Sequence, residues 1–484
     1  MTFARDETAS RSLGSKLATI SCLVLLAFVW TANSSGLISS NDGSHLALAR
    51  ALALRAEASI DPDRALTLEV DLAEREDHAY SDRPPGTAFA ALPAAWVGDR
   101  LDPWMLERAM AQARAGREVA PLPAARPYIA TYAARVAGGS TGPKLAALIG
   151  SSIAISIHAV LVGLLGLALV DRLLRQIVEL DSRARLLALA SLGLASAWGP
   201  YSTTLFSHVS AATAVAGFLL GLVELERGGT RVAALTGLAG AWAIACDYSL
   251  LLAIVPAVAL TIPWRRWGAV ALGAAPIVIA TLAYHALAFG SPLALGYDHQ
   301  RNFAFARERG STFSGDFFDG LWTLWGLGRG AGLLAQAPIV LVGLATLVAV
   351  GLRLRLRNRR GDRSDEQPLA ILLRALLGFV PWIVALALHR TPWGGGTGDH
   401  RYLIPILPFA AVGLALAWAR ARPALRVAVV ALALASAFLV WRHFLAWHEA
   451  TPFARPGLAA LVAAVVLVIA STPLLRRVGR KRAS

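Results

Sequence analysis

Long apolar blocks separated by short polar connections set the pattern of the chain. The blocks run about 18 to 25 residues, which is enough helix to cross a hydrocarbon core of ~30 Å. They lack the polar stripe at helical spacing that a helix on the surface of a soluble protein carries. We therefore expect about twelve transmembrane spans, at residues 17–38, 145–170, 186–200, 207–224, 232–246, 249–263, 267–289, 330–352, 369–389, 402–419, 424–441 and 457–475. Those between 186 and 263 are short and could tilt or merge.

Composition agrees with this pattern. Of 484 residues, 56% are hydrophobic and only 16% are charged, whereas a soluble protein carries about a quarter charged residues. The sequence thus predicts an all-α polytopic membrane protein that forms one transmembrane domain over residues 1–484. We expect one large insertion, the first extracytoplasmic loop at residues 39–144, and no separate soluble C-terminal domain.

Basic residues orient the spans, because Lys and Arg stay on the cytoplasmic side of a membrane. They cluster at the N-terminus, in alternate connections and in the tail, for example at Arg172 and Arg175, from Arg353 to Arg363, and from Arg476 to Arg482. Both termini are therefore expected in the cytoplasm, with the chain in the plasma membrane. The net charge of +15 follows from this topology and from anionic inner-leaflet lipid, so nucleic acid is not expected as a partner.

The long first outer loop has local patterns of its own. Residues 44–58 are typical of a helix that lies along the membrane surface, and residues 65–71 alternate like a short strand. Pro84-Pro85-Gly86 opens the apolar stretch 87–97, which is too short to cross. Two further dipeptides have a proline at a first helical position and predict helix starts, Asp102-Pro103 and Arg126-Pro127.

Chemistry is expected on the outer face. None of the ten histidines lies in a predicted cytoplasmic segment, and the inner connections contain no glycine-rich phosphate cradle. Nucleotide-activated substrates are not supplied outside the membrane. A group donor used there would have to be carried across on a lipid.

Asp42 and His45 lie just beyond the first predicted span, in Ser40-Asn41-Asp42-Gly43-Ser44-His45. A carboxylate at the water–lipid boundary can act as a general base toward an acceptor hydroxyl. Alternatively, Asp42 caps a helix that begins near Ser44, which is a common role for Asp.

Arg83 precedes the paired prolines in Tyr80-Ser81-Asp82-Arg83-Pro84-Pro85. The prolines fix the backbone and place a guanidinium at the membrane surface, where it can bind phosphate through two hydrogen bonds. The alternative is an arginine that extends its head to lipid headgroups.

Further polar side chains gather at outer loops and outer helix ends. Boundary ionisable groups of this kind are costly and usually functional, although any single one can be a solvated loop charge. The candidates for substrate or phosphate binding are His208, Asp247, Tyr297, His299, Arg329, Arg401 and Tyr402. A zinc site needs three or four spaced ligands, and no such spacing is visible.

Taken in order, these motifs resemble the GT-C class of membrane glycosyltransferases, in particular protein O-mannosyltransferases, lipid A aminoarabinose transferases and their bacterial relatives. Asp42 follows the first span, where the family has an acidic motif. Arg83-Pro84-Pro85-Gly86 matches a basic residue before a proline pair. Residues 289–297 (FGSPLALGY) and 328–330 (GRG) resemble a middle loop, and Arg401-Tyr402-Leu403-Ile404-Pro405 resembles a late RYL-x-P signature.

The resemblance implies a polyprenyl-phosphate-linked sugar donor and an inverting transfer to an envelope lipid, glycan or protein. Asp42 would be the base, and Arg83, Arg401 and Arg329 would hold the donor phosphate. Gly43 stands where the family has a second acid, which puts any role for that acid in doubt. Some relatives need a divalent metal and others do not, so the resemblance implies no certain cofactor.

Two other functions fit a chain of this kind. A transporter or flippase would place polar residues at mid-bilayer on several helices, whereas here they collect at one face. A non-catalytic scaffold for envelope assembly would account for the long first loop. Loss of sugar transfer on substitution of Asp42 separates the enzyme from both.

Overall fold

The computed structural model describes residues 2–34, 36–37, 39–114, 148–177, 180–358 and 367–447. The predicted span 457–475 and the predicted helix start at Arg126-Pro127 lie outside these residues.

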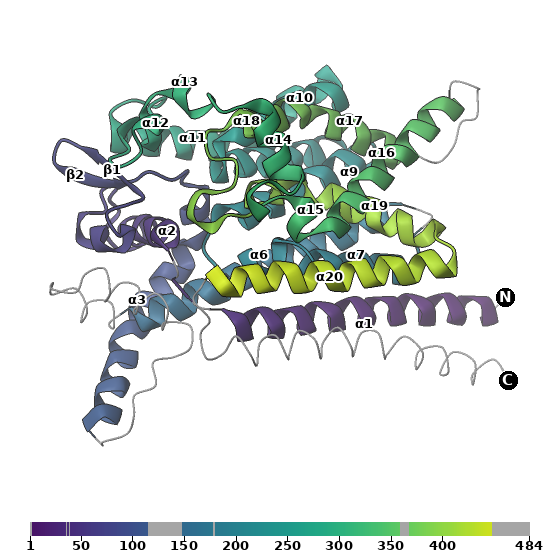
Figure 1. The fold of residues 1–484 in the computed structure, drawn as a ribbon, viewed down its shortest axis with the longest axis horizontal. Helices are drawn as coiled ribbons and strands as arrows, with labels where there is room; N and C mark the ends of the chain where they lie inside the picture. The colour runs from purple at the N-terminus through teal and green to yellow at the C-terminus, as the bar shows by residue number, and fades with distance from the viewer. Residues whose placement is uncertain are drawn as a thin grey trace.

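Long apolar helices run side by side along the length of the molecule (Figure 1). Eight helical segments in the described part of the chain are long and apolar enough to cross a membrane. They lie in α1 (Thr2–Asn33), α6 (Ile149–Arg175), α9 (Ser207–Cys246), α11 (Trp267–Phe289), α17 with α18 (Gln367–Gly378, Val380–Leu388), η9 with α19 (Arg401–Ile406, Leu407–Arg420) and α20 (Pro423–Trp447). Helix α9 supplies two of them, because the backbone turns at Gly229 with a φ of 59°. The predicted all-α polytopic architecture is confirmed.

The remaining described spans have shorter apolar stretches. Helices α10 (Leu251–Thr261) and α16 (Pro338–Asn358) occupy the predicted spans 249–263 and 330–352. Helix α16 begins later than predicted, because η7 (Gly328–Gly330) and α15 (Leu333–Gln336) precede it. The predicted span 186–200 falls on α7 (Ser182–Leu194), which has 13 residues, and on α8 (Trp198–Tyr201).

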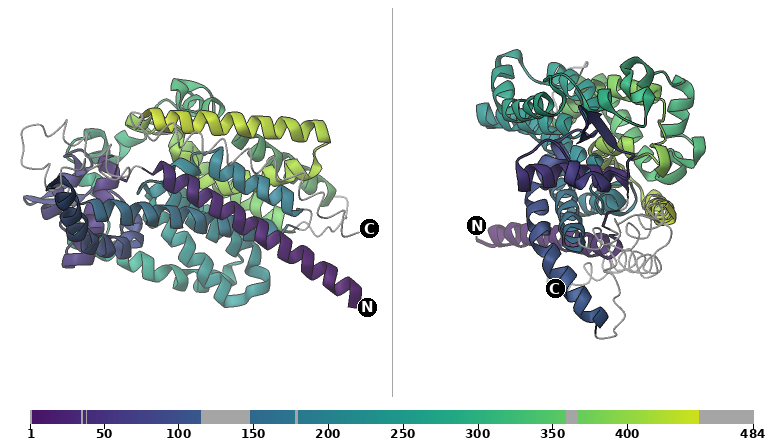
Figure 2. Two further views of the ribbon diagram at one scale, coloured as in Figure 1. Left: turned by 90° about the horizontal axis from the view of Figure 1, so that it is seen from below. Right: turned by 90° about the vertical axis from the view of Figure 1, so that its left-hand side faces the viewer.

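One end of the bundle, which we call the hairpin end, contains β1, β2 and α2, and the N-terminal end of α1 lies at the opposite end (Figure 1). Helix α2 (Ser40–Arg50) continues as the π-helix η1 (Ala51–Arg55), so the predicted helix at 44–58 is present but starts and ends earlier. Helix α3 (Gly86–Arg114) runs across the direction of the other helices (Figure 2). Residues 290–330 form short helices here and beside the bundle, α12 (Ala304–Arg307), α13 (Arg309–Thr312) and α14 (Phe317–Trp325).

The predicted strand at residues 65–71 is wrong. Residues Asp61–Thr67 form the 3₁₀ helix η2, which begins with Pro62 in its first turn, a position that suits proline. The strands follow, β1 (Leu72–Arg75) and β2 (His78–Ser81), paired antiparallel with Leu72 opposite Ser81. The two turn residues between them have positive φ, as a tight hairpin requires.

The predicted helix start at Asp102-Pro103 is also wrong, because Pro103 lies inside α3. The Asp102 carboxylate instead accepts hydrogen bonds from the Ser151 backbone N–H at 2.8 Å and from the Ser151 hydroxyl at 2.7 Å. Ser151 lies in the first turn of α6, where backbone N–H groups lack partners within the helix. Asp102 therefore accepts hydrogen bonds at the start of α6 and does not begin a helix of its own, although its local sequence predicts one.

Helix α11 packs directly against the second half of α9. A Cβ atom added at Gly273 would lie 1.8 Å from the Ala234 carbonyl oxygen, and one added at Gly237 would lie 1.9 Å from the Val270 carbonyl oxygen. Small residues at such crossings let two membrane helices approach backbone to backbone. This close packing fixes the position of α11. The C-terminal end of α11 leads into the loop that reaches the hairpin.

We expect Gly273→Ala to destabilise the protein by about 1–3 kcal/mol, because the added methyl group forces α9 and α11 apart. The matched control is Gly268→Ala on the same helix, where a Cβ meets nothing within 4 Å. Thermal unfolding of the detergent-solubilised protein measures both. Equal melting temperatures for the two variants would contradict the packing described here.

Candidate active site

Asp42 lies in the first turn of α2, but it does not cap that helix. The N-cap is Ser39, whose side chain accepts the Asp42 backbone N–H, so the alternative interpretation of Asp42 as the cap is wrong. The carboxylate is fully buried. Its Oδ1 accepts the Leu205 backbone N–H at 2.7 Å, and its Oδ2 accepts the Ser39 hydroxyl at 2.9 Å. Asp42 thereby joins α2 to the segment that precedes α9.

Arg83 follows the end of β2 and pairs with two carboxylates. Its Nη2 donates to Asp71 Oδ1, and its Nε lies 3.3 Å from Asp82 Oδ1. Asp71 also accepts a hydrogen bond from the Ser40 hydroxyl at the start of α2. The next residues continue this anchoring, since a Cβ at Gly86 would lie 2.5 Å from the Ala245 carbonyl carbon of α9.

Arg401 is buried at the start of the predicted tenth span, yet its guanidinium is only partly bonded. Its nearest carboxylate oxygen, Asp399 Oδ1, is 3.9 Å from Nη1, and Asp399 Oδ2 accepts the Tyr201 hydroxyl. The Nε and Nη1 atoms of Arg401 have no hydrogen-bond partner. The guanidinium carbon stands 5.3 Å from the ring centroids of both Phe206 and Tyr402. Such a group has donors available for an anion.

Two histidines lie near these arginines. His45 is fully buried on α2, and both of its ring nitrogens lack a hydrogen-bond partner. His208, in the first turn of α9, has an unpartnered Nδ1 and packs edge-on to Tyr402 with ring centroids 5.5 Å apart. Arg401, Arg83 and His45 all lie within electrostatic range of His208. The structure therefore gathers Arg83, His45, His208, Arg401 and Tyr402 into one basic cluster beside Asp42.

The loop after α11 covers one side of this cluster. Gly296 lies so close to Asp82 that an added Cβ would stand 2.8 Å from the Asp82 Cα. Tyr297 follows directly and lies within electrostatic range of Arg83. Gln300 donates from Nε2 to Asp82 Oδ2 at 3.2 Å and to the Val70 carbonyl at 2.9 Å.

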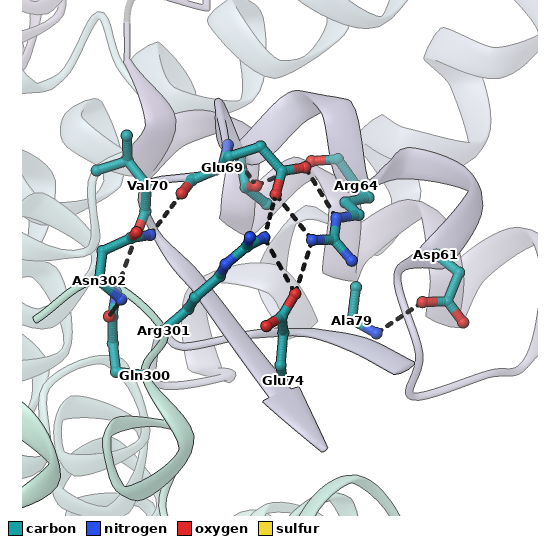
Figure 3. Close-up of polar contacts among 10 residues, drawn as sticks. Asp61, Arg64, Glu69, Val70, Glu74, Ala79, Gln300, Arg301 and Asn302 are labelled. Atoms are coloured by element: carbon teal, nitrogen blue, oxygen red, sulfur yellow. Dashed lines mark hydrogen bonds and ion pairs between the residues drawn. The ribbon is translucent and has the colours of Figure 1, made fainter. Parts of the chain in front are cut away.

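Ion pairs attach the same loop to the hairpin from outside (Figure 3). Arg301 Nη1 lies 2.7 Å from Glu69 Oε2 and 3.2 Å from Glu74 Oε1, and Arg64 bonds to the same two carboxylates. The Arg301 backbone N–H also donates to the Leu72 carbonyl at 3.0 Å. The loop thus adds a third segment to the edge of the two-stranded sheet.

Burial sets the protonation of two side chains at the hairpin end. Burial raises the pKa of the Asp82 carboxyl to about 6; the Arg83 charge opposes this shift, and the Asp71 charge adds to it. Burial lowers the pKa of His45 to about 3, with a further contribution from the Arg83 charge. His45 is therefore neutral at pH 7, so its ring offers one N–H donor and one acceptor nitrogen.

Three candidates lie outside the basic cluster. His299 stacks on Phe289 with ring centroids 5.2 Å apart. Asp247 accepts the Ser249 backbone N–H at 3.0 Å and the Ser249 hydroxyl at 2.7 Å. Arg329, which is exposed, lies over the Trp393 ring at 3.9 Å from the centroid. Its backbone is in the left-handed region, with a φ of 52°, which is uncommon for a residue other than glycine.

Four residues at the site were not singled out by the sequence, Asp71, Asp82, Asp399 and Gln300. Asp82 directly precedes Arg83, and Asp399 lies two residues before Arg401; this closeness in sequence is the only local signal for them. Nothing in the local sequence marks Asp71 or Gln300. Among the described residues, no three His, Cys, Asp or Glu side chains come together as a metal site.

No protein-family model matches the sequence, and no curated protein matches it. Among solved structures, the chain is similar to the crystal structure of ArnT from Cupriavidus metallidurans bound to undecaprenyl phosphate. The two share 14% sequence identity with a TM-score of 0.51, over 93% of this chain and 75% of that one. The apo structure of the same ArnT gives a TM-score of 0.49 at 14% identity, over 94% and 75% of the chains. ArnT is a lipid A aminoarabinose transferase with the GT-C fold, so the predicted GT-C-like architecture is confirmed at the level of the fold.

We expect Asp82→Asn to gain stability relative to the unchanged protein as the pH rises from 4 to 8. A carboxyl whose pKa is higher in the folded state than in the unfolded state loses stabilising free energy as the pH rises through that interval. The shift from 3.8 to about 6 corresponds to about 3 kcal/mol. Melting temperatures at the two pH values measure the change.

The control for this titration is Asp61→Asn at the exposed turn region. At Asp61, burial raises the pKa, but hydrogen bonds from Ser59, the Ala79 N–H and His78 outweigh it, so the net shift is downward. Its substitution should cost stability at pH 8 and not at pH 2 to 3 (the opposite dependence). A pH-independent effect of Asp82→Asn would show that its charge is not disfavoured.

Proposed function

We propose that this protein is a glycosyltransferase that moves a sugar from a polyprenyl-phosphate-linked donor to an envelope acceptor, with inversion at the transferred carbon. The reaction takes place at the hairpin end, which faces the outside of the plasma membrane, while the N-terminus lies in the cytoplasm. The acceptor is a lipid, a glycan or a protein. The GT-C fold supports the class of reaction, and the side chains of this chain support the individual roles.

A single observation carries the proposal: the buried Arg401 guanidinium has unbonded donors beside a second arginine and a buried carboxylate. Buried polar groups in proteins are almost always bonded, and orphaned guanidinium N–H groups suit a phosphate. Arg401 packs on Phe206, and Asp42 binds the backbone of Leu205. The anion-binding group and the proposed base therefore flank one short segment, residues 205–206.

In the proposed transfer, Asp42 takes the proton of the acceptor hydroxyl. The acceptor oxygen forms a bond to the sugar carbon, while the bond from that carbon to the phosphate oxygen breaks. The electron pair of the broken bond stays on the phosphate. The Asp42 oxygens accept hydrogen bonds from the Leu205 backbone and the Ser39 hydroxyl, which hold the carboxylate in place for the proton transfer.

Arg83 and Arg401 would hold the donor phosphate, with Arg329 at the edge of the same region. Gln336 supports this arrangement, because its Nε2 donates to the Gly330 carbonyl at 2.8 Å and to the Gly398 carbonyl at 3.2 Å. One side chain thus ties the loop of Arg329 to the loop of Arg401. Tyr297 and Tyr402 would line the sugar, and surrounding membrane lipid would receive the polyprenyl chain.

Asp42→Asn should lower sugar transfer at least a hundredfold, since general-base catalysis contributes about 10²–10⁴-fold. The asparagine oxygen can still accept the Leu205 N–H, so the fold is retained. The assay is release of undecaprenyl phosphate from a panel of undecaprenyl-phosphate sugars by purified protein with envelope extract as acceptor. Asp61→Asn, an exposed carboxyl of the same loop, is the control. Unchanged turnover in Asp42→Asn refutes the assignment of the base.

The outer location of the hairpin end predicts the labelling of introduced cysteines. In intact cells, His78→Cys at the exposed start of β2 should react with a membrane-impermeant thiol reagent. Thr230→Cys, exposed at the bend in α9, should react only after lysis. The native Cys22 and Cys246 are buried and provide little background. Labelling with the reverse sidedness would place Asp42 in the cytoplasm and remove the basis for a lipid-carried donor.

A further inference from the structure

The carboxylates at the site outnumber the arginines before any substrate enters. Arg83 is matched by Asp71 and Asp82, and Arg401 has Asp399 as its nearest carboxylate. Asp42 adds a further carboxylate nearby. Two guanidinium groups therefore do not leave a large positive charge for a phosphate group. An entering anion needs additional donors.

Unbonded donors exist on the two histidines. His45 is fully buried with both ring nitrogens unpartnered, and His208 is 7% exposed with Nδ1 unpartnered. A buried imidazole without hydrogen bonds carries the desolvation cost of its polar atoms, and nothing in the described protein offsets that cost here. Arg401, Arg83 and His45 each lie within electrostatic range of His208, and His45 also lies within range of Arg83, so both rings belong to the same region of the protein.

The surrounding structure fixes these rings. His45 lies one helical turn after Asp42 on α2, so both side chains share a face of that helix. His208 is held among Tyr201, Phe206 and Tyr402, whose ring centroids are 6.3, 6.3 and 5.5 Å away. The histidines are therefore set in place before a ligand binds, as electrostatic stabilisation of a developing charge requires.

The proposed transfer changes the charge of the phosphate. A polyprenyl-phosphate sugar is a phosphodiester with one negative charge. When the bond from the sugar carbon to the phosphate oxygen breaks, the electron pair leaves a monoester. This monoester carries up to two negative charges, because the second pKa of such a phosphate is about 6. An enzyme gains rate from contacts that strengthen as this charge develops.

We propose that His45 and His208 bind the phosphate oxygen released in the transfer and thereby make the site selective for a phosphate monoester over a phosphodiester. This inference rests on the proposed function and assigns a distinct role within it. The two arginines hold either form of the phosphate, whereas the histidines respond to the second negative charge. His45 and His208 are then catalytic residues, since they contact the leaving group.

The test measures binding rather than turnover. The purified full-length protein is titrated with undecaprenyl phosphate and, separately, with its methyl phosphodiester, in detergent at pH 7.5. The unchanged protein should bind the monoester at least tenfold more tightly. In His45→Gln and His208→Asn, the affinity for the monoester should fall toward that for the diester. That fall of about tenfold or more corresponds to the loss of one hydrogen bond to a charged group, whereas the affinity for the diester should stay within about twofold.

His78→Gln is the control, because this exposed histidine pairs with Asp61 on the hairpin, away from the cluster. Melting temperatures show whether each variant folds. Equal binding of the two ligands by the unchanged protein overturns the histidine role but leaves the proposed function standing. Parallel loss of both ligands in the histidine variants also overturns it. Binding of neither ligand by the unchanged protein overturns the proposed function itself.

Discussion

The ion pairs of Arg83 with Asp71 and Asp82 are the contacts on which the hairpin end depends. A charge that leaves water is costly unless an opposite charge meets it, and removal of one partner leaves the other buried and unpaired. Asp71 also bonds the Ser40 hydroxyl at the start of α2, and Asp82 bonds Gln300 of the loop after α11. Three segments that are distant in sequence are therefore held at one point, and the position of Asp42 follows from it.

Much of the fold could be predicted from the sequence, because the bilayer imposes a simple rule. A helix is the one local structure that satisfies every backbone group in hydrocarbon, so the long apolar blocks within the described residues form helices. The predictions that proved wrong concern segments of the first outer loop, to which this rule does not apply. There, η2 replaced the strand expected at 65–71, since a proline in the first turn and local hydrogen bonds outweighed the alternating pattern. The strands formed immediately after it.

The candidate site could be predicted in part. Position along the chain and the predicted side of the membrane identified several candidates that the structure brings together: Asp42, His45, Arg83, His208 and Arg401. Their partners could not be predicted, because the pairs are formed between distant segments. Asp42 binds the backbone of a residue 163 positions away. Asp102 shows the same effect: its local motif indicates a helix start, and a contact 49 positions away decides its role.

The two arginines of the site differ in a way that bears on function. Arg83 is paired with two carboxylates, as the cost of a buried charge demands, and it stabilises the hairpin end. Arg401 is more deeply buried than Arg83, yet two of its nitrogens have no hydrogen-bond partner, against the Nε alone in Arg83. A protein can keep such an unsatisfied group only where the rest of the structure over-determines its position, and these places are usually functional. The packing of Arg401 on Phe206 and Tyr402, together with the bond from Tyr201 to Asp399, provides that support. In the proposed reaction both guanidinium groups hold the phosphate, but Arg83 also holds the hairpin end together, whereas Arg401 has more donors left for an anion.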